Sequence, residues 1–297
     1  METSDVIKLS VCITTYNRAK RLNETLASLR QQTRQPDQLV ISDDCSHDGT
    51  GEVVASWQAR FRNFVSHRNE SNLNMPGNLN RAISLCNGEY VANLHDADTF
   101  DPTLIEKWEA ALDQHPTAGF AFCGLRIPEQ QKDYLEEGVE PFTPGREFFE
   151  RHQIHRYGSR VWGTVMARRT SYQKLGPFDP QLGFISDVDM WFRMFQHFDV
   201  CYIKEPLIYL DNEMTESRRF TWWKLFVANR IMVANIRRFY AYDTPRLEAA
   251  LRKQKHVMKA MFLRWLAGRV WRRDMPNLWR GLVYAVPVLT APYDLDC

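Results

Sequence analysis

Residues 9–17 read LSVCITTYN, and residues 39–50 read LVISDDCSHDGT. Each stretch begins with a short apolar, β-branched run and ends in polar residues, which is typical of a buried strand that gives way to a loop. Behind the first run, Leu22, Leu26 and Leu29 recur at helical spacing. The two stretches therefore predict units of strand and helix, with polar side chains where the strands end.

The same alternation of apolar runs and amphipathic stretches continues along the chain. Residues 90–94 form another apolar run, and further strand-like runs follow at residues 161–167 and 200–203. Strands that alternate with helices of about ten to fifteen residues indicate βαβ units. We expect an α/β fold over residues 1–210, with an open, mainly parallel twisted sheet flanked by helices, and a helical C-terminal extension over residues 211–297.

The composition is that of a globular protein, since 44% of the 297 residues are hydrophobic and 25% are charged. The longest nearly uncharged stretch, residues 281–293, is too short to cross a bilayer as a helix. The amino-terminal residues lack the basic and apolar regions of a secretion signal, so we expect a cytoplasmic protein. Six cysteines lie far apart without C-x-x-C spacing, which argues against a zinc site or a disulfide framework.

The net charge of +2 hides an asymmetry along the chain. The segment from Arg218 to Arg280 holds 16 Lys or Arg and 3 Asp or Glu, so the rest of the chain is acidic. Basic residues interleaved with tryptophan and phenylalanine are typical of helices that lie on an anionic membrane surface, here the cytoplasmic face. A solvated helical face is the alternative. Nucleic acid is the least favoured partner, because no recognised binding module accompanies the charge.

Polar loops follow three of the predicted strands. Thr14 and Tyr16 follow the first, Asp43 and Asp44 follow the second, and residues 95–98 (HDAD) follow the run at 90–94. In open α/β sheets, ligands bind beyond the carboxyl ends of the strands, and parallel strands bring those ends to one edge. Carboxylates there would hold a hard cation such as Mg²⁺ or Mn²⁺ that bridges to a diphosphate, or accept hydrogen bonds from a ribose or a base.

A second group of acidic residues lies further along the chain, in KLGPFD (residues 174–179) and SDVDMWFR (residues 186–193). Asp187 is predicted to lie at the start of a helix, where free backbone N–H groups favour a carboxylate for structural reasons alone. The functional alternative is a general base, because transfer to a hydroxyl needs a carboxylate that takes the proton of the attacking group. Asp189 is the second choice for that role.

Several common catalytic motifs do not occur. The sequence contains no G-x-G-x-x-G after a strand, no G-x-x-x-x-G-K-[ST], no H-E-x-x-H and no G-x-S-x-G. Each of these motifs supplies a specific physical element, such as a phosphate cradle or a nucleophile elbow. Hydride transfer on a dinucleotide fold, P-loop hydrolysis and serine hydrolysis are therefore not indicated.

Four segments, taken in order, resemble the inverting family 2 glycosyltransferases, which have the GT-A fold. The resemblance runs from Leu9 to Leu210, about two-thirds of the chain. It covers a T-x-Y-N-R loop, a V-x-D-D-x-S-x-D-G-T loop, a strand leading to a D-x-D motif, and a closing block of G-x-F-D and D-x-D-x-W-x-R. The matching segments are VCITTYNRAKRL, VISDDCSHDGT, NGEYVANLHDAD and LGPFDPQLGFISDVDMWFRM.

The resemblance implies a nucleotide-sugar site. It places Thr14 and Tyr16 around the nucleotide base, with Asp43 as the partner of a base N–H and Asp44 nearby. Asn80 matches the asparagine of a later R-N pair, in which a leucine replaces the arginine, and is expected in the same site.

The resemblance also implies a metal site and a catalytic base. Asp96 and Asp98 form the D-x-D pair near the ribose and a Mn²⁺ or Mg²⁺ ion, and Asp98 is favoured as the metal ligand. Asp187 is the implied catalytic base, with Ser186 where the family usually has a glutamate. Asn74 stands where the family usually carries the glycine of N-x-G.

The expected activity is metal-dependent, inverting transfer of a sugar from a nucleotide-sugar donor, a UDP-sugar in the first instance. The acceptor would be a hydroxyl of a saccharide or a lipid-linked saccharide in cell-surface polysaccharide synthesis. Two alternatives stay open. One is a non-catalytic GT-A-like binding or scaffolding protein. The other is a sugar-nucleotide nucleotidyltransferase, which would be expected to begin with a glycine-rich phosphate loop that residues 14–18 do not contain.

Overall fold

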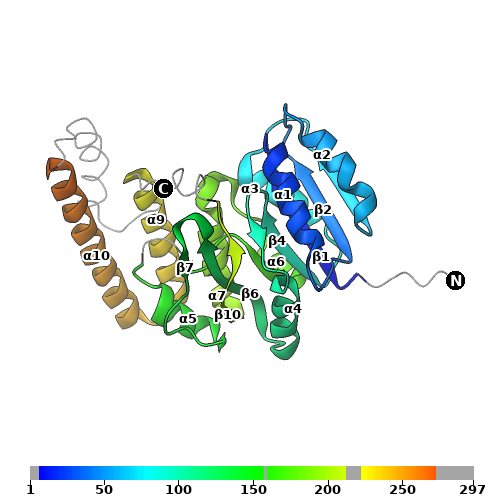
Figure 1. Cartoon of the computed structure of the whole chain (residues 1–297). Helices are drawn as coiled ribbons and strands as arrows, with labels where there is room; N and C mark the ends of the chain where they lie inside the picture. Colours follow the sequence, from blue (N-terminus) through cyan, green and yellow to red (C-terminus); the bar gives the residue numbers. More distant parts are fainter. Residues whose placement is uncertain (1–6, 157–158, 212–221, 272–297) are drawn as a thin grey trace. The chain divides into compact units, whose positions relative to one another are not determined.

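The structure, a computed structural model, describes residues 7–156, 159–211 and 222–271. Its contacts divide the chain into two compact units (Figure 1). Unit 1 comprises Met1–His152 and Ser159–Arg218, and unit 2 comprises Gln153–Gly158 and Arg219–Cys297. The chain thus contributes six residues to unit 2, returns to unit 1, and then enters unit 2 again.

The first half of unit 1 is a parallel sheet whose strands occur in the order β3-β2-β1-β4. The hydrophobic runs quoted above form β1, β2 and β4, which are buried along nearly their whole length, as is usual for parallel strands covered on both faces. The edge strand β3 is only partly buried. Helices α1 and α2 lie side by side beside β1 and β2 (Figure 1). The bounds are β1 Leu9–Thr15, α1 Ala19–Arg30, β2 Gln38–Asp43, α2 Thr50–Trp57, β3 Phe64–Arg68, α3 Asn74–Ser84 and β4 Tyr90–His95.

The second half of unit 1 continues the same sheet with antiparallel pairs. Beyond β4 the order is β9-β6-β10-β5, with β7 on β6 and β8 on β10; β6 and β10 run parallel, and β9 is antiparallel to both β4 and β6. The α/β sheet flanked by helices confirms the predicted fold class. The bounds are β5 Thr99–Phe100, α4 Leu104–Gln114, β6 Ala118–Ile127, β7 Lys132–Tyr134, β8 Phe142–Thr143, α5 Gly145–Phe148, β9 Val165–Arg168, α6 Arg169–Leu175, α7 Ser186–His197 and β10 Asp199–Tyr209.

The core of unit 1 is apolar and densely aromatic. Leu22, Leu26 and Leu29 of α1 are fully buried against the sheet, as their helical spacing predicted. On the other half of the sheet, the ring of Phe120 on β6 stacks on Trp191 of α7 with centroids 5.6 Å apart. Burial of such side chains supplies most of the stabilisation. It also fixes α7, which carries Asp187, on the sheet.

The strand order creates a place for a ligand between β1 and β4. From β1 the chain moves outward to β2 and β3, and it then returns to the other side of β1 to form β4. Connections that diverge from neighbouring strands leave a crevice beyond their carboxyl ends, and ligands of open α/β sheets bind there. The residues that follow Thr15 and His95 therefore face this crevice.

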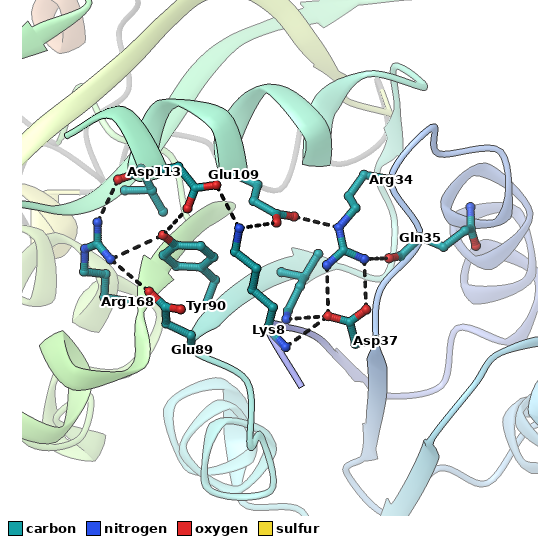
Figure 2. A network of polar contacts seen from close by, with 11 residues as sticks. Lys8, Arg34, Gln35, Asp37, Glu89, Tyr90, Glu109, Asp113 and Arg168 are labelled. Atoms are coloured by element: carbon teal, nitrogen blue, oxygen red, sulfur yellow. Dashed lines mark hydrogen bonds and ion pairs between the residues drawn. The ribbon is translucent and has the colours of Figure 1, made fainter. Parts of the chain in front are cut away.

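A polar network lies at the amino-terminal ends of these strands, opposite the end where the crevice lies (Figure 2). The Lys8 ammonium lies 2.9 Å from Glu109 and 2.8 Å from Asp113, and Arg34 lies 2.7 Å from Glu109. Asp37 accepts two hydrogen bonds from Arg34 and two from the backbone N–H groups that open β1. The network joins the starts of β1 and β2 to α4.

Unit 2 contains two helices, α9 Trp222–Phe239 and α10 Thr244–Trp271. Residues 218–221 and 272–280 of the predicted basic segment lie outside the described residues. Ile231 and Ile236 of α9 are buried, as are Met258 and Phe262 of α10. Unit 2 also contains a series of side-chain hydrogen bonds, in which Gln254 binds Asn229 at 2.8 Å and His155 at 3.0 Å. Among the described residues, no helix has the length and apolar character needed to cross a membrane.

Candidate active site

Asp43 ends β2 at the predicted ligand edge and is 5% exposed. Its Oδ1 accepts hydrogen bonds from the backbone N–H of Ser46, at 3.1 Å, and from the Ser46 hydroxyl. Its Oδ2 lies 3.8 Å from an Arg68 Nη1. In the sheet, Asp43 pairs with Thr15 of β1, so it lies beside the crevice. The carboxylate is held by its own loop, and its second oxygen keeps capacity for another donor.

Asp44 is also buried, but it is tied to the following loop. Its Oδ1 accepts from the Asn69 side chain at 2.9 Å and from the Leu73 N–H at 2.8 Å. Asn78 completes the arrangement by bonding both Asn69 and Ser42. Asn74, where the family carries glycine, has a φ of 61°. Asparagine tolerates this left-handed conformation better than most residues, so the turn survives without the glycine.

Thr14 lies within the end of β1 rather than after it, and Tyr16 follows the strand. Thr14 lies in register between Ser42 of β2 and His95 of β4. Tyr16 lies just past the strand and is 42% exposed, which is unusual for a large ring. The Asn17 backbone adopts a φ of 51° and its N–H donates to the Ser46 hydroxyl, so the β1 and β2 loops are joined directly.

Asp48 belongs to the same acidic loop but has a structural role. Its Oδ2 accepts from the N–H of Ala19 at 3.0 Å, where α1 begins, and its Oδ1 accepts from the N–H of Thr50. Burial acts to raise the pKa of Asp48, while the hydrogen bonds from Thr50 and Ala19 act to lower it; the net result is a pKa below the usual value. The carboxylate therefore stays ionised and anchors two helix starts.

Asp96 and Asp98 are buried together just beyond β4, with exposures of 4% and 2%. Asp96 Oδ1 accepts from Arg18 at 2.7 Å, which links the β4 loop to the β1 loop across the crevice. Asp96 Oδ2 and Asp98 Oδ2 are buried and have no hydrogen-bond partner, although His95 Nδ1 lies 3.5 Å from the latter. A buried carboxylate oxygen without a donor costs about 1–3 kcal/mol, so these two atoms are candidate contacts for a ligand.

His95 and Gly163 connect this pair to Asp187. The Asn93 side chain donates to the Gly163 carbonyl at 2.8 Å, which holds residue 163 against β4. A Cβ on Gly163 would lie 2.6 Å from Nε2 of His95 and 3.5 Å from Oδ2 of Asp187. The imidazole and the Asp187 carboxylate therefore both lie against Gly163. Nδ1 of the same ring lies 3.5 Å from Asp98 Oδ2, so His95 connects Asp98 with the part of the site formed by Gly163 and Asp187.

Asp187 and Asp189, the two candidates for a general base, differ in their surroundings. Asp187 lies in the first turn of α7, is half-buried, and accepts the Val188 N–H through Oδ1 at 2.8 Å. Asp189 is 8% exposed, and its Oδ2 accepts from Arg193 at 2.8 Å. The Arg193 guanidinium also donates to the carbonyls of Leu175 and Pro177. Asp189 thus braces a loop, whereas Asp187 lies at the site.

Asn80 lies on α3, and its amide binds a different part of the chain. Its Nδ2 donates to the Phe178 carbonyl, and its Oδ1 accepts the Phe178 N–H, both at 2.8 Å. Asn80 therefore positions the loop that leads to Asp187. Its predicted contact with the nucleotide-sugar stays a prediction.

The structure adds residues that the sequence did not single out as site residues. These residues are Arg18, His95, Gly163 and Arg193. The contacts of the first three join segments that are 65 or more residues apart, and Arg193 binds a loop carbonyl. Such contacts depend on the tertiary fold. Two of these residues had a local signal, since the R of the T-x-Y-N-R loop is Arg18 and the R of D-x-D-x-W-x-R is Arg193.

Comparison with known proteins identifies the family. The sequence pattern described as glycosyl transferase family 2 matches residues 10–176, more than half of the chain. EpsE of Bacillus subtilis (strain 168), a glycosyltransferase by name, is 25% identical over 226 residues, covering 72% of this chain and 77% of EpsE. An uncharacterized glycosyltransferase of Haemophilus influenzae is 27% identical over 205 residues, covering 68% of this chain and 67% of that protein.

Solved structures share the fold at lower identity. S. aureus TarS 1-349 in complex with UDP-GlcNAc has a TM-score of 0.61 at 16% identity, covering 92% of this chain and 89% of that one. This chain spans 54% of the longer TarS chain. The mannosyltransferase PcManGT from Pyrobaculum calidifontis, in complex with GDP-Man and Mn²⁺, has a TM-score of 0.59 at 16% identity, covering 97% and 88%. With the motifs, the strand order and the family match in agreement, the chain belongs to glycosyl transferase family 2.

Proposed function

We propose that this glycosyltransferase moves a sugar from a nucleotide-sugar, a UDP-sugar in the first instance, to a hydroxyl with inversion at the anomeric carbon and with the help of a divalent cation. The observation that carries the proposal is the arrangement around His95. Its ring lies 3.5 Å from the buried Asp98 on one side, and on the other side the ring and the half-buried Asp187 both lie against Gly163. Structural neighbours in complex with UDP, UDP-GlcNAc and GDP-Man support a nucleotide-sugar donor.

In this proposal, the donor nucleotide binds at the ends of β1 and β2. Asp43 accepts an N–H of the base through the oxygen that its own loop leaves available, and the exposed ring of Tyr16 covers the base. Thr14 lines the crevice between them, and Asp44 holds the loop that closes the far side. Asp96 lies nearest the ribose, because Arg18 holds it beside the β1 loop.

The donor set fits a hard divalent cation. Asp96 Oδ2 and Asp98 Oδ2 are buried carboxylate oxygens without a hydrogen-bond partner, and Mn²⁺ and Mg²⁺ prefer carboxylate oxygen as a ligand. No group of three or more His, Cys, Asp or Glu side chains suited to a metal occurs among the described residues, so oxygens of the diphosphate would complete the shell. A cation bound there would neutralise the charge that develops on the leaving nucleoside diphosphate.

Asp187 acts as the general base in this proposal. The acceptor oxygen forms a bond to the anomeric carbon while the bond from that carbon to the diphosphate oxygen breaks, and the hydroxyl proton passes to Asp187 Oδ2. One displacement of this kind inverts the anomeric centre. Asp187 suits the role because its Oδ1 is fixed by the Val188 N–H and its Oδ2 is directed toward Gly163.

The acceptor proposed is a hydroxyl of a saccharide or of a lipid-linked saccharide in cell-surface polysaccharide synthesis. A lipid-linked acceptor requires the enzyme to work beside a membrane. We therefore propose a peripheral association with an anionic bilayer at its cytoplasmic face, through the basic segment of unit 2.

The test compares Asp187→Asn with Asp179→Asn in the full chain. Asp179 caps a turn in the same loop by accepting the Gln181 N–H, and asparagine caps equally well, so it is a matched control. Sugar transfer from a panel of nucleotide-sugars is measured with Mn²⁺, and donor binding is followed by thermal shift. We expect Asp187→Asn to lose about 100-fold or more of turnover, with donor binding retained and Asp179→Asn unaffected. Full activity of Asp187→Asn would overturn the proposed base.

A further inference from the structure

The exposed residues of α10 fall on one face of the helix. Between positions 252 and 267 successive exposed residues are one or three positions apart, which is the spacing of a single stripe on an α-helix. The stripe extends over about 20 Å at the usual rise per residue. We call it the basic face of α10; its members are Arg252, Lys253, His256, Lys259, Ala260, Leu263, Arg264 and Ala267.

The opposite face of α10 is already used inside unit 2. Gln254, Met258 and Phe262 are 3%, 3% and 7% exposed. Met261, Trp265 and Leu266 pack against the last two. Because the apolar contacts of the helix are taken up within its own unit, the basic face is the side that α10 leaves for solvent or a partner.

The basic face carries unbalanced positive charge. From Ala249 to the end of α10 at Trp271 the sequence contains six Lys or Arg and no Asp or Glu. Arg252 pairs with Glu248 at 3.2 Å, and both side chains are exposed. Within the part of the chain that the structure describes, no carboxylate pairs with Lys253, Lys259 or Arg264. These three cations are therefore available to an anionic partner.

One apolar side chain interrupts the charge. Leu263 is 61% exposed, one of few large hydrophobic side chains with such exposure among the described residues, and it lies beside Lys259 and Arg264 on the same face. A lone leucine gains little from a nucleic-acid backbone, whereas a lipid interface accepts an apolar side chain between basic ones. The combination favours phospholipid over polynucleotide.

We infer that the basic face of α10 is a docking surface for an anionic phospholipid bilayer, with Lys253, Lys259 and Arg264 against the headgroups and Leu263 inserted between them. The inference deepens the membrane association proposed above by naming its surface. Its test needs neither donor nor acceptor, so it can fail while the transferase proposal stands, and the reverse also holds.

The experiment measures sedimentation of the full chain with sucrose-loaded vesicles of phosphatidylcholine, with and without phosphatidylglycerol. The variant Lys253→Gln/Lys259→Gln/Arg264→Gln removes the three available cations. Each basic residue near an anionic bilayer strengthens partitioning about fivefold, so the triple variant should bind the anionic vesicles about 100-fold more weakly. Binding of the unaltered chain should fall as salt is raised.

The matched control is Arg30→Gln/Arg81→Gln/Lys132→Gln, which makes the same change in net charge at three exposed positions of unit 1. It should bind anionic vesicles as the unaltered chain does, and both variants should keep the melting temperature. Equal weakening in the two triple variants would show a net-charge effect and would overturn the assignment of the surface.

A further variant separates lipid from polynucleotide. Leu263→Gln should weaken binding to anionic vesicles, with binding to polyuridylate unchanged, because only the lipid interface takes up the leucine. Vesicle binding that is indifferent to Leu263→Gln, or tighter binding to polyuridylate than to vesicles, would overturn the choice of phospholipid.

Discussion

The side-chain amide of Asn80 is paired with the backbone amide of Phe178 through two hydrogen bonds of 2.8 Å, across 98 residues of sequence. The pair fastens α3 to the loop that leads to Asp187. Arg193 holds the start of the same loop by binding the carbonyls of Leu175 and Pro177. A carboxylate that must meet an acceptor hydroxyl needs such support, because a displacement of about 1 Å can cost about 100-fold in rate.

Replacing Asn80 should therefore affect turnover more than donor affinity. Asn80→Ala removes both hydrogen bonds and should destabilise the fold by about 1–3 kcal/mol while lowering kcat about 10- to 100-fold. Asn80→Asp keeps the acceptor for the Phe178 N–H, so its kcat and its stability should lie between those of Asn80→Ala and those of the unaltered chain. Steady-state kinetics and thermal melts check this. A raised donor KM with kcat unchanged would instead favour the nucleotide-sugar contact predicted from the sequence.

Gly163 lies against both the His95 ring and the Asp187 carboxylate, so a methyl group at this position should disturb both side chains. Gly163→Ala places a Cβ within 2.6 Å of His95, and the ring must move. Overpacking of this kind costs about 1–3 kcal/mol, and we expect transfer activity to fall with it. The double variant His95→Ala/Gly163→Ala removes the clash and should be more stable than Gly163→Ala. If the two changes are additive in urea unfolding, the proposed contact is wrong.

Metal removal should abolish the stabilisation that a nucleotide gives. With metal and UDP at about 100 times the Kd, the folded state gains about 2.7 kcal/mol, which appears as a higher melting temperature. EDTA should cancel the shift, and Asp98→Asn should show little of it. Asp48→Asn serves as the control, because the carboxylate of Asp48 accepts hydrogen bonds at the starts of two helices and is not part of the proposed metal site. A shift that persists in EDTA would contradict the proposed cation.

The network at the amino ends of the strands should make stability depend on acid pH. Burial acts to raise the pKa of Asp37, but hydrogen bonds from Arg34 and from the N–H groups of Leu9 and Lys8 outweigh it and leave the pKa below its usual value. A lowered folded-state pKa stabilises the protein above the unfolded pKa of about 4. This contribution is therefore lost as pH falls below about 4.

Urea unfolding from neutral pH down to about pH 3 checks this dependence. Asp37→Asn should lose about 1–3 kcal/mol at neutral pH and should show a flatter acid limb than the unaltered chain. Asp133→Asn is the control, because its pair with Arg126 is at the surface and such pairs contribute little. An acid limb unchanged by Asp37→Asn would place the dependence on other carboxylates.

Local pattern was sufficient for the main features of the fold. Burial of strands β1, β2 and β4 and of Leu22, Leu26 and Leu29 follows from periodicity alone. The placement of Thr14, Asp43 and the Asp96 loop on one edge follows from the rule that parallel strands share their carboxyl ends.

The sequence could not reveal contacts made between distant segments. Strand β9 lies between β4 and β6 and runs antiparallel to both. An apolar run predicts a buried strand but not its neighbours in the sheet or its direction. Likewise, Asp189 differs from Asp187 because Arg193 binds its carboxylate. The side chain of Asn80 binds the loop that leads to Asp187 because Phe178 lies beside it. These roles arise from geometry that neighbouring residues along the chain do not determine.

The twofold entry of the chain into unit 2 limits how the protein can be divided. Gln153–Gly158 belongs to unit 2 although both flanking segments belong to unit 1, and His155 in that excursion bonds Gln254 of α10. A chimera that exchanges only residues 219 onward would separate His155 from its native partner on α10, Gln254. Engineers who wish to exchange unit 2 between relatives must therefore transplant both pieces together.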